Sequence, residues 1–258
     1  MNMFRDNLPG TTGRTITDLL LEKPGYDELI KEWPTGLTDQ AFEFVWRGYD
    51  LLKDEVLDRV DCNKADKQIE KDTTSNLESR IGRVMTRDEA FDEAFDVQHE
   101  APEFTTTYSN QAQPPSYDIA FILRANPQIK LPLEAKVLKT EGKLSEYIKE
   151  IKFNFLTCRY SPFSSEAGML GYLLTGNPKR VFKNIEKKVP CTLSDHPDFL
   201  DRDHKVSDHD RTVPPNKPYP KKFRCHHLIL NLQSTKKSNV SQETKSTKVS
   251  KPVSDSEE

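Results

Sequence analysis

The chain has 258 residues and a formal net charge of −3, with 34% hydrophobic and 31% charged residues. This length allows one domain of ordinary size with appendages, and a core that needs neither disulfides nor a structural metal. A mean hydropathy of −0.75 predicts that part of the chain stays outside that core. No apolar run is long enough to span a bilayer, and the first residues form no hydrophobic signal segment. We therefore expect a cytoplasmic protein without a membrane partner.

The charge is distributed unevenly along the chain. Residues 1–129 carry 14 Lys/Arg against 25 Asp/Glu, a balance of −11, whereas residues 130–189 carry 12 against 6, a balance of +6. An anionic polymer would be attracted to the basic half, and the acidic half would repel it or meet a basic partner. Two solvated faces would give the same pattern.

The four cysteines lack C-x-x-C spacing, so neither a disulfide framework nor a cysteine zinc cage is indicated.

Both ends of the chain differ from its middle. Residues 1–72 are interpreted as a helical N-terminal extension, in which PGYDELIKEWP and LTDQAFEFVWRGYDLLKDEVLDRV predict helices. The second helix has an aromatic stripe typical of core packing, made by Phe42, Val45, Trp46, Tyr49, Leu52 and Val56. Residues 234–258 contain almost no large apolar side chain, which predicts a disordered tail. The segment between them, residues 73–233, is expected to be the folded domain.

Regular elements follow one another through this domain. Ser75 and Glu78 have the spacing of a capping box, which predicts a helix beginning there. The apolar patterns and turn signals then predict three strands, a helix, a strand, a helix and a last strand; the segments are DVQHEAPEF, SYDIAFIL, KLPLEAKVL, residues 144–155, GMLGYLL, the helix after Asn177-Pro178, and RCHHLILNL. This order predicts an α/β fold with a mixed sheet and helices packed on its faces.

Three polar residues interrupt two of the apolar strands. Asp118 lies in SYDIAFIL, which is apolar on both faces, as in a central strand, where an ionised carboxylate is costly unless a cation or a donor accommodates it. In LPLEAKVL, Glu134 and Lys136 are two residues apart and so project from the same face. A short connection containing Asn126-Pro127 joins the two strands, so a hairpin is expected to bring Asp118 close to Glu134.

Two converging carboxylates are ligands that suit Mg²⁺, which is often held by one or two carboxylates, several waters and a substrate phosphate. Such an ion neutralises the phosphate and activates water. Lys136 is placed to orient or deprotonate that water and to stabilise the charge that develops on phosphorus. The alternative is structural, with Glu134 and Lys136 as a surface ion pair and Asp118 bonded to backbone N–H groups.

The arrangement of Asp118, Glu134 and Lys136 on successive strands, followed by a helix and a further strand, resembles the PD-(D/E)XK nuclease superfamily, to which restriction endonucleases belong. The resemblance covers residues 74–190 and implies a restriction-endonuclease-like αβββαβ core, dependence on Mg²⁺ or Mn²⁺, and cleavage of phosphodiester bonds. It makes Asp118 and Glu134 metal ligands and Lys136 catalytic. Glu78 falls where many members place another metal-binding acid. Tyr117 stands where the literal motif has proline.

Other polar residues have both a functional and a structural interpretation. Glu100 is a candidate for the surroundings of the metal site, as is His99 on the opposite face, and both are also ordinary structural residues. A group of basic or aromatic residues is placed to contact phosphates, or simply to form a solvated helix face: Lys139, Lys143, Lys152, Arg159 and Tyr160. The His- and Asp-rich segment between Cys191 and Pro214 is expected to be a loop, and its irregular spacing argues against a zinc site.

These observations predict a metal-dependent endonuclease acting on nucleic acid, with double-stranded DNA as the expected substrate and a bacterial restriction or phage-defence role as the expected context. A protein partner or a homodimer is expected, because cutting both strands of a duplex takes two scissions. Two alternatives remain: a catalytically silent nuclease-fold subunit that binds nucleic acid or a protein, and an RNA-cleaving nuclease. No nucleotide-binding glycine motif is present.

Overall fold

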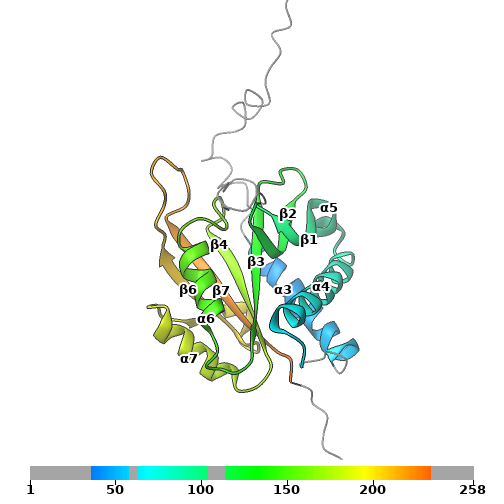
Figure 1. Cartoon of the computed structure of the whole chain (residues 1–258). Coiled ribbons are helices and arrows are strands. Elements are labelled where there is room, and N and C mark those ends of the chain that lie inside the picture. Colours follow the sequence, from blue (N-terminus) through cyan, green and yellow to red (C-terminus); the bar gives the residue numbers. More distant parts are fainter. Residues whose placement is uncertain (1–35, 58–62, 104–113, 234–258) are drawn as a thin grey trace, which may run out of the picture.

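The chain folds around one mixed sheet whose strands lie in the order β1-β2-β3-β4-β7-β6-β5 (Figure 1). The structure, a computed structural model, describes residues 36–57, 63–103 and 114–233. The strands are β1 (Phe95–Pro102), β2 (Ser116–Leu123), β3 (Lys130–Leu138), β4 (Glu166–Leu173), β5 (Ser194–Asp195), β6 (His204–Asp210) and β7 (Lys222–Asn231). The helices are α3 (Leu37–Glu55), α4 (Asp66–Met85), α5 (Glu89–Ala94), α6 (Ser145–Glu150), the π-helical turn η2 (Ile151–Phe155), α7 (Pro178–Lys188) and the 3-10 turn η3 (Pro197–Phe199). The predicted α/β class, with a mixed sheet flanked by helices, is confirmed.

Strand β3 lies at the boundary between the antiparallel and parallel parts of the sheet. On one side β1, β2 and β3 are antiparallel neighbours, so the expected hairpin between β2 and β3 is present. On the other side β3 is parallel to β4, and β4 is parallel to β7. The connection from β3 to β4 runs through α6 and η2, as parallel neighbours require a crossover. Side chains of β3 therefore lie at the centre of the sheet, between helices of both layers.

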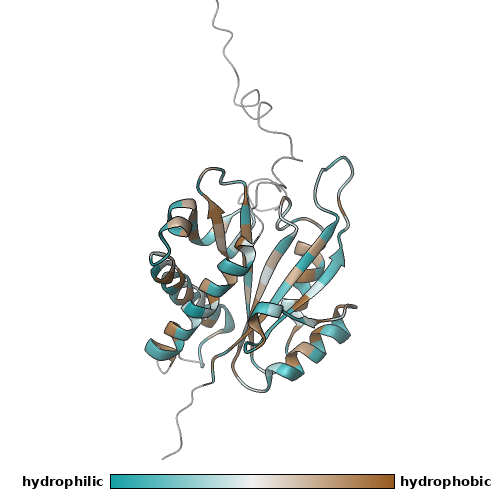
Figure 2. Ribbon diagram, turned by 180° about the vertical axis from the view of Figure 1, so that it is seen from behind, coloured by the Kyte–Doolittle hydropathy of each residue, from teal (hydrophilic) through white to brown (hydrophobic). Residues whose placement is uncertain are grey.

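Two apolar cores cover the two faces of the sheet. The first packs α3 and α4 against strand residues such as Ile119, Leu133 and Tyr172. The second packs α6, η2 and α7 against residues such as Ala120, Met169 and Ile229. Along the helices in Figure 2 the colour alternates between hydrophobic and hydrophilic, as expected for helices that bury one face.

Helix α3 belongs to the core of the sheet domain. The predicted stripe is buried except for Val56, the half-buried C-cap residue: Phe42 and Leu52 are fully buried, and Phe42 stacks on His226 of β7 with 4.3 Å between ring centroids. The predicted boundary between residues 72 and 73 falls inside α4, so the described part of the N-terminal extension is continuous with the domain. The helix predicted from PGYDELIKEWP and the tail at residues 234–258 lie outside the described residues.

Helix α4 begins earlier than predicted. Its first residue is Asp66, and Ala65 at the N-cap position makes no side-chain capping bond. Ser75 is an interior residue of this helix, so the predicted capping box of Ser75 and Glu78 is wrong. A buried hydrogen bond attaches α4 to the sheet: the Thr74 hydroxyl lies 2.9 Å from the Tyr172 hydroxyl of β4.

Strand β6 occupies part of the segment predicted to be a loop, and its histidines are buried in hydrogen-bond chains. Trp46 donates to His204 Nδ1 at 3.3 Å, and His204 Nε2 lies 3.2 Å from His226 Nδ1. On the opposite face, His227 lies between the Tyr147 hydroxyl and Ser207 Oγ, at 3.0 and 2.8 Å. These imidazoles therefore join the helical layers to β6 and β7.

Within the described residues no helix combines the length and the apolar character that crossing a bilayer requires.

Replacing Phe42 by Ala is expected to lower the free energy of unfolding by about 3–5 kcal/mol, because a fully buried aromatic ring leaves a cavity beneath α3. Urea unfolding measures this loss. Glu43→Ala on the exposed side of the same helix turn is the control and should change stability by less than about 0.5 kcal/mol. A loss below about 1 kcal/mol for Phe42→Ala would mean that α3 is peripheral to the core.

Acid is expected to destabilise the protein through its buried histidines. Burial lowers the pKa of His204 to about 2 and of His227 to about 3, while an unfolded imidazole titrates near 6.5. Because these folded-state pKa values are depressed, the stabilisation is present above pH 6.5 and is lost as the pH falls below it, by up to about 1.4 kcal/mol per pH unit for each imidazole. Urea unfolding at pH 7.5 and 5.5 tests this. A His227→Gln variant should lose less stability between pH 7.5 and 5.5 than the wild type. Equal losses would mean that His227 does not contribute to the acid sensitivity.

Candidate functional site

The predicted residues Asp118, Glu134 and Lys136 meet at the centre of the sheet. Lys136 Nζ lies 2.7 Å from Glu134 Oε1 and 3.6 Å from Asp118 Oδ2. A third carboxylate, Glu70 of α4, lies 3.4 Å from the same ammonium. The site therefore combines side chains from β2, β3 and α4 around a single lysine, and we call these four residues the carboxylate–lysine cluster.

The end of the β2–β3 pairing explains this convergence. The ladder between the two strands runs from Ile122 opposite Lys130 to Ile119 opposite Leu133 and includes no further pair. Beyond it, the Asp118 carboxylate accepts a hydrogen bond from the Ala135 N–H at 2.7 Å. Glu70 accepts one from the Val137 N–H at 3.3 Å. The two acids thus satisfy the edge of β3 where β2 no longer pairs with it.

Glu78 is not part of this cluster. It lies eight residues after Glu70 on the same helix, about 12 Å along the axis. Its pKa is raised mainly by burial, and its charged neighbours are His99 and Asp96 of β1. The acid that α4 contributes to the cluster is Glu70, which sequence reasoning missed. A signal for it exists in the sequence: Ile69 and Thr73 continue the stripe of Leu77, Ile81 and Val84 upstream of Ser75, and this spacing predicts an earlier helix start.

The electrostatics of the cluster are dominated by excess negative charge. Burial and the neighbouring Asp118 raise the pKa of Glu134 well above its ordinary value, and Glu150 of α6 adds to this effect. Burial and Asp118 also raise the pKa of Glu70. Burial alone would lower the pKa of Lys136, but the three carboxylates outweigh it and raise that pKa. Lys136 is therefore an ammonium at neutral pH, and one ammonium faces three carboxyl groups.

One oxygen of the cluster has no donor. Glu134 Oε1 accepts from Lys136, whereas Glu134 Oε2 is buried and has no hydrogen-bond partner among the described residues. A buried carboxylate oxygen without a donor is costly, and a cation or a proton would relieve that cost. Oxygen donors from three carboxylates fit a hard divalent cation such as Mg²⁺ or Mn²⁺, so Glu70, Asp118 and Glu134 are the residues that could hold one.

The other predicted candidates lie at several places around the cluster. Tyr160 is buried close to it, since burial and then the charges of Glu134 and Glu150 raise the pKa of Tyr160. Glu100 is exposed on β1 and pairs with Lys71 of α4 at 3.0 Å, so it is outside the cluster. Lys139 pairs with Asp66 at the start of α4. The remaining basic candidates are Lys143 and Arg159, which are exposed, and Lys152, which is half-buried.

A second group of possible metal ligands lies at the other end of the sheet, where Asp39, His196 and Asp198 place one ligand atom each within 4.8 Å of one another. Both ring nitrogens of His196 already have partners. Nδ1 accepts from the Asp198 N–H at 3.3 Å, which puts the proton on Nε2, and Nε2 lies 3.2 Å from Asp39. A metal on Nε2 would move that proton to Nδ1, where it would face the Asp198 N–H. The hydrogen bonds therefore account for this group without a metal.

No family model, curated protein or solved structure was found to match this chain. The functional argument accordingly rests on the geometry and chemistry of the cluster.

Neutralising Glu134 is expected to stabilise the protein in the absence of divalent metal. A raised folded-state pKa means that ionisation of this carboxyl at neutral pH opposes folding, and glutamine keeps an oxygen for Lys136 without the charge. Glu134→Gln should raise Tm by about 2–4 °C in a chelator, whereas Glu146→Gln on the exposed face of α6 should not. Calorimetry with and without chelator measures this. A lower Tm for Glu134→Gln in the chelator would contradict the conclusion that the charge of Glu134 opposes folding.

Proposed function

We propose that this protein is a divalent-metal-dependent nuclease that hydrolyses phosphodiester bonds of DNA. The observation that carries the proposal is the cluster itself, in which three carboxylates surround one lysine and the buried Glu134 Oε2 has no donor among the described residues. Mg²⁺ is the expected ion, and Mn²⁺ is expected to replace it.

The order of elements supports membership in the PD-(D/E)XK superfamily. Helix α4, strands β1, β2 and β3, helix α6 and strand β4 follow one another along the chain, apart from the short α5, in agreement with the expected αβββαβ order. The acids come from the expected strands. The acid expected from the preceding helix is Glu70 in place of Glu78.

The residues of the cluster have distinct roles in this proposal. Asp118, Glu134 and Glu70 hold the ion, which supplies charge neutralisation at the phosphate and a water of lowered pKa. Lys136 is held as an ammonium by its three neighbours, so it positions the attacking water and stabilises negative charge on the phosphoryl oxygens, and does not remove the water's proton. Backbone bonds from Ala135 and Val137 fix the Asp118 and Glu70 carboxylates in place before substrate arrives.

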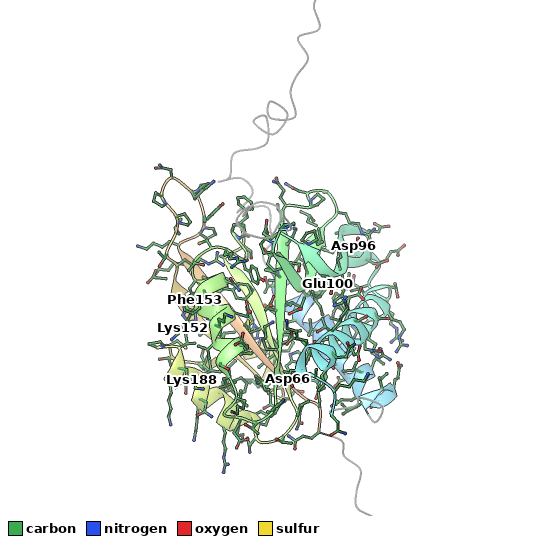
Figure 3. All side chains as sticks on the ribbon, viewed as in Figure 1. Asp66, Asp96, Glu100, Lys152, Phe153 and Lys188 are labelled. Atoms are coloured by element: carbon green, nitrogen blue, oxygen red, sulfur yellow. The ribbon has the colours of Figure 1, made fainter. Side chains whose placement is uncertain are left out.

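Two cations that would contact a phosphate backbone lie on the α6 side of the site. Lys152 lies on η2 and Arg159 in the loop that follows it, whereas Lys149 of α6 pairs with the exposed Glu146 at 3.4 Å. The other wall, α4 and β1, carries acids such as Glu100 and Asp96, labelled in Figure 3 across β3 from Lys152. Nucleic acid is therefore expected to bind along the α6 side.

Cleavage of supercoiled plasmid in Mg²⁺ or Mn²⁺ tests the proposal. Asp118→Ala, Lys136→Ala and Glu70→Gln should each reduce the rate at least about 100-fold, because each removes a ligand or the charge beside the reacting phosphate. Glu78→Gln is the matched control, an acid of the same helix outside the cluster, and should cut at the wild-type rate.

Loss of cutting in Glu78→Gln, with cutting kept in Glu70→Gln, would contradict Glu70 as the metal-binding acid of α4. Cutting that persists in Asp118→Ala and Lys136→Ala, at matched folding and purity, would place the activity elsewhere. No cutting by any form, with no Mn²⁺ binding that depends on Glu134, would support the silent-subunit alternative instead.

A further inference from the structure

Two buried hydroxyl groups join helix α4 to the sheet one helical turn from Glu70. Thr74 of α4 and Tyr172 of β4 are fully buried, and their hydroxyl oxygens lie 2.9 Å apart. Glu70 and Thr74 are four residues apart, so they lie on the same face of the helix. Val137 of β3, whose N–H donates to Glu70, lies opposite Tyr172 in the parallel register. The hydroxyl pair is therefore next to the point where the Glu70 carboxylate reaches β3.

Among the described residues, Glu70 is the acid of the cluster that makes no short hydrogen bond. Its carboxylate lies 3.3 Å from the Val137 nitrogen and 3.4 Å from Lys136 Nζ. By contrast, Asp118 accepts a backbone N–H of β3 at 2.7 Å, and Glu134 lies 2.7 Å from Lys136. Hydrogen bonds longer than about 3.2 Å are weak, so β3 by itself holds Glu70 loosely. The position of this carboxylate therefore depends on how α4 packs on the sheet.

Apolar packing alone does not fix the position of α4. The helix buries a stripe that includes Ile69, Leu77 and Ile81 in the same core as strand β3 (Figure 1). Hydrophobic attraction is non-directional, so such a stripe tolerates a small shift or rotation of the helix. A hydrogen bond requires a narrow range of distance and direction. The bond between Thr74 and Tyr172 therefore supplies the directional contact that sets where this turn of α4 lies over the sheet.

We propose that the hydrogen bond between Thr74 and Tyr172 positions the Glu70 carboxylate at β3, so that both hydroxyls are positioning groups for the metal-binding acid of α4. The consequence for metal binding rests on the proposed nuclease function. Both side chains are fully buried, so they act through Glu70 and not on the substrate. Without the bond α4 would be free to shift, and Glu70 would withdraw from the Val137 N–H and from the ion together.

Hydrogen exchange of single backbone amides tests the positioning in metal-free protein. The double variant Thr74→Val/Tyr172→Phe removes both hydroxyls, so neither is left buried without its partner, and Tm should stay within about 4 °C of the wild type. The Val137 amide should exchange at least about tenfold faster in this variant, because its acceptor is the Glu70 carboxylate. The Ala135 amide, whose acceptor comes from β2, should keep its rate. Thr74→Ser retains a hydroxyl and should keep both rates.

Mn²⁺ affinity of the full chain, measured by titration calorimetry, tests the consequence for the metal site. Thr74→Val/Tyr172→Phe and Glu70→Gln should each weaken the Kd about tenfold. The triple variant should bind at most about twofold more weakly than Glu70→Gln, because the hydroxyls act only through that acid. Tyr49→Phe is the matched control. It removes a buried tyrosine hydroxyl of the same core, one that donates to the Asn231 carbonyl, and should leave the Kd unchanged.

The positioning and the metal site fail in different ways. An unchanged Val137 exchange rate in the double variant, or an equal acceleration of the Ala135 amide, would overturn the positioning. Losses of Mn²⁺ affinity that add up in the triple variant would overturn it as well. If the wild type binds no Mn²⁺ while the Val137 amide is still released selectively, the positioning stands and the metal site fails. If Mn²⁺ binding depends on Glu70 and not on the two hydroxyls, only the positioning is overturned.

Discussion

The early end of the β2–β3 ladder is the constraint on which the site depends. Once pairing stops at Ile119, the N–H groups of Ala135 and Val137 lack strand partners in a buried region, and buried N–H groups require acceptors. Asp118 and Glu70 supply them. Two carboxylates are thereby brought to the middle of an apolar sheet, where Glu134 and Lys136 already share a face. The Asp118 and Glu70 carboxylates are thus positioned by backbone N–H groups of β3.

Much of this arrangement follows from period-two alternation in the sequence. The strands β2 and β3, their hairpin and the shared face of Glu134 and Lys136 are all visible as short apolar runs interrupted by single polar residues, because a central strand has few other reasons to carry a charge. The early end of the ladder is not visible in this way. It is a property of the tertiary structure, because nothing in the local sequence of β2 or β3 marks the last pair of the ladder.

Where the sequence-based predictions differ from the structure, particular residues explain the difference. Helix α4 begins at Asp66 behind an N-cap residue, Ala65, that offers no side-chain signal, so the Ser75–Glu78 spacing predicts a later start and leaves Glu70 outside the helix. Strand β6 carries His204, Ser207 and His209, and its polarity predicts a loop because hydrogen-bond chains to Trp46 and Tyr147 cannot be read from local sequence.

The charge balance of the cluster helps to distinguish an active metal site from a catalytically silent nuclease-fold subunit. With one ammonium among three carboxyl groups, ionisation of Glu134 opposes folding, and its Oε2 gains no hydrogen bond among the described residues in return. A silent scaffold would be more stable with a neutral side chain at this position. The same excess charge is what gives a site affinity for a divalent cation, because the ion would offset the mutual repulsion of the three carboxylates. The destabilising feature and the proposed activity thus have one origin, which favours the enzyme over the scaffold.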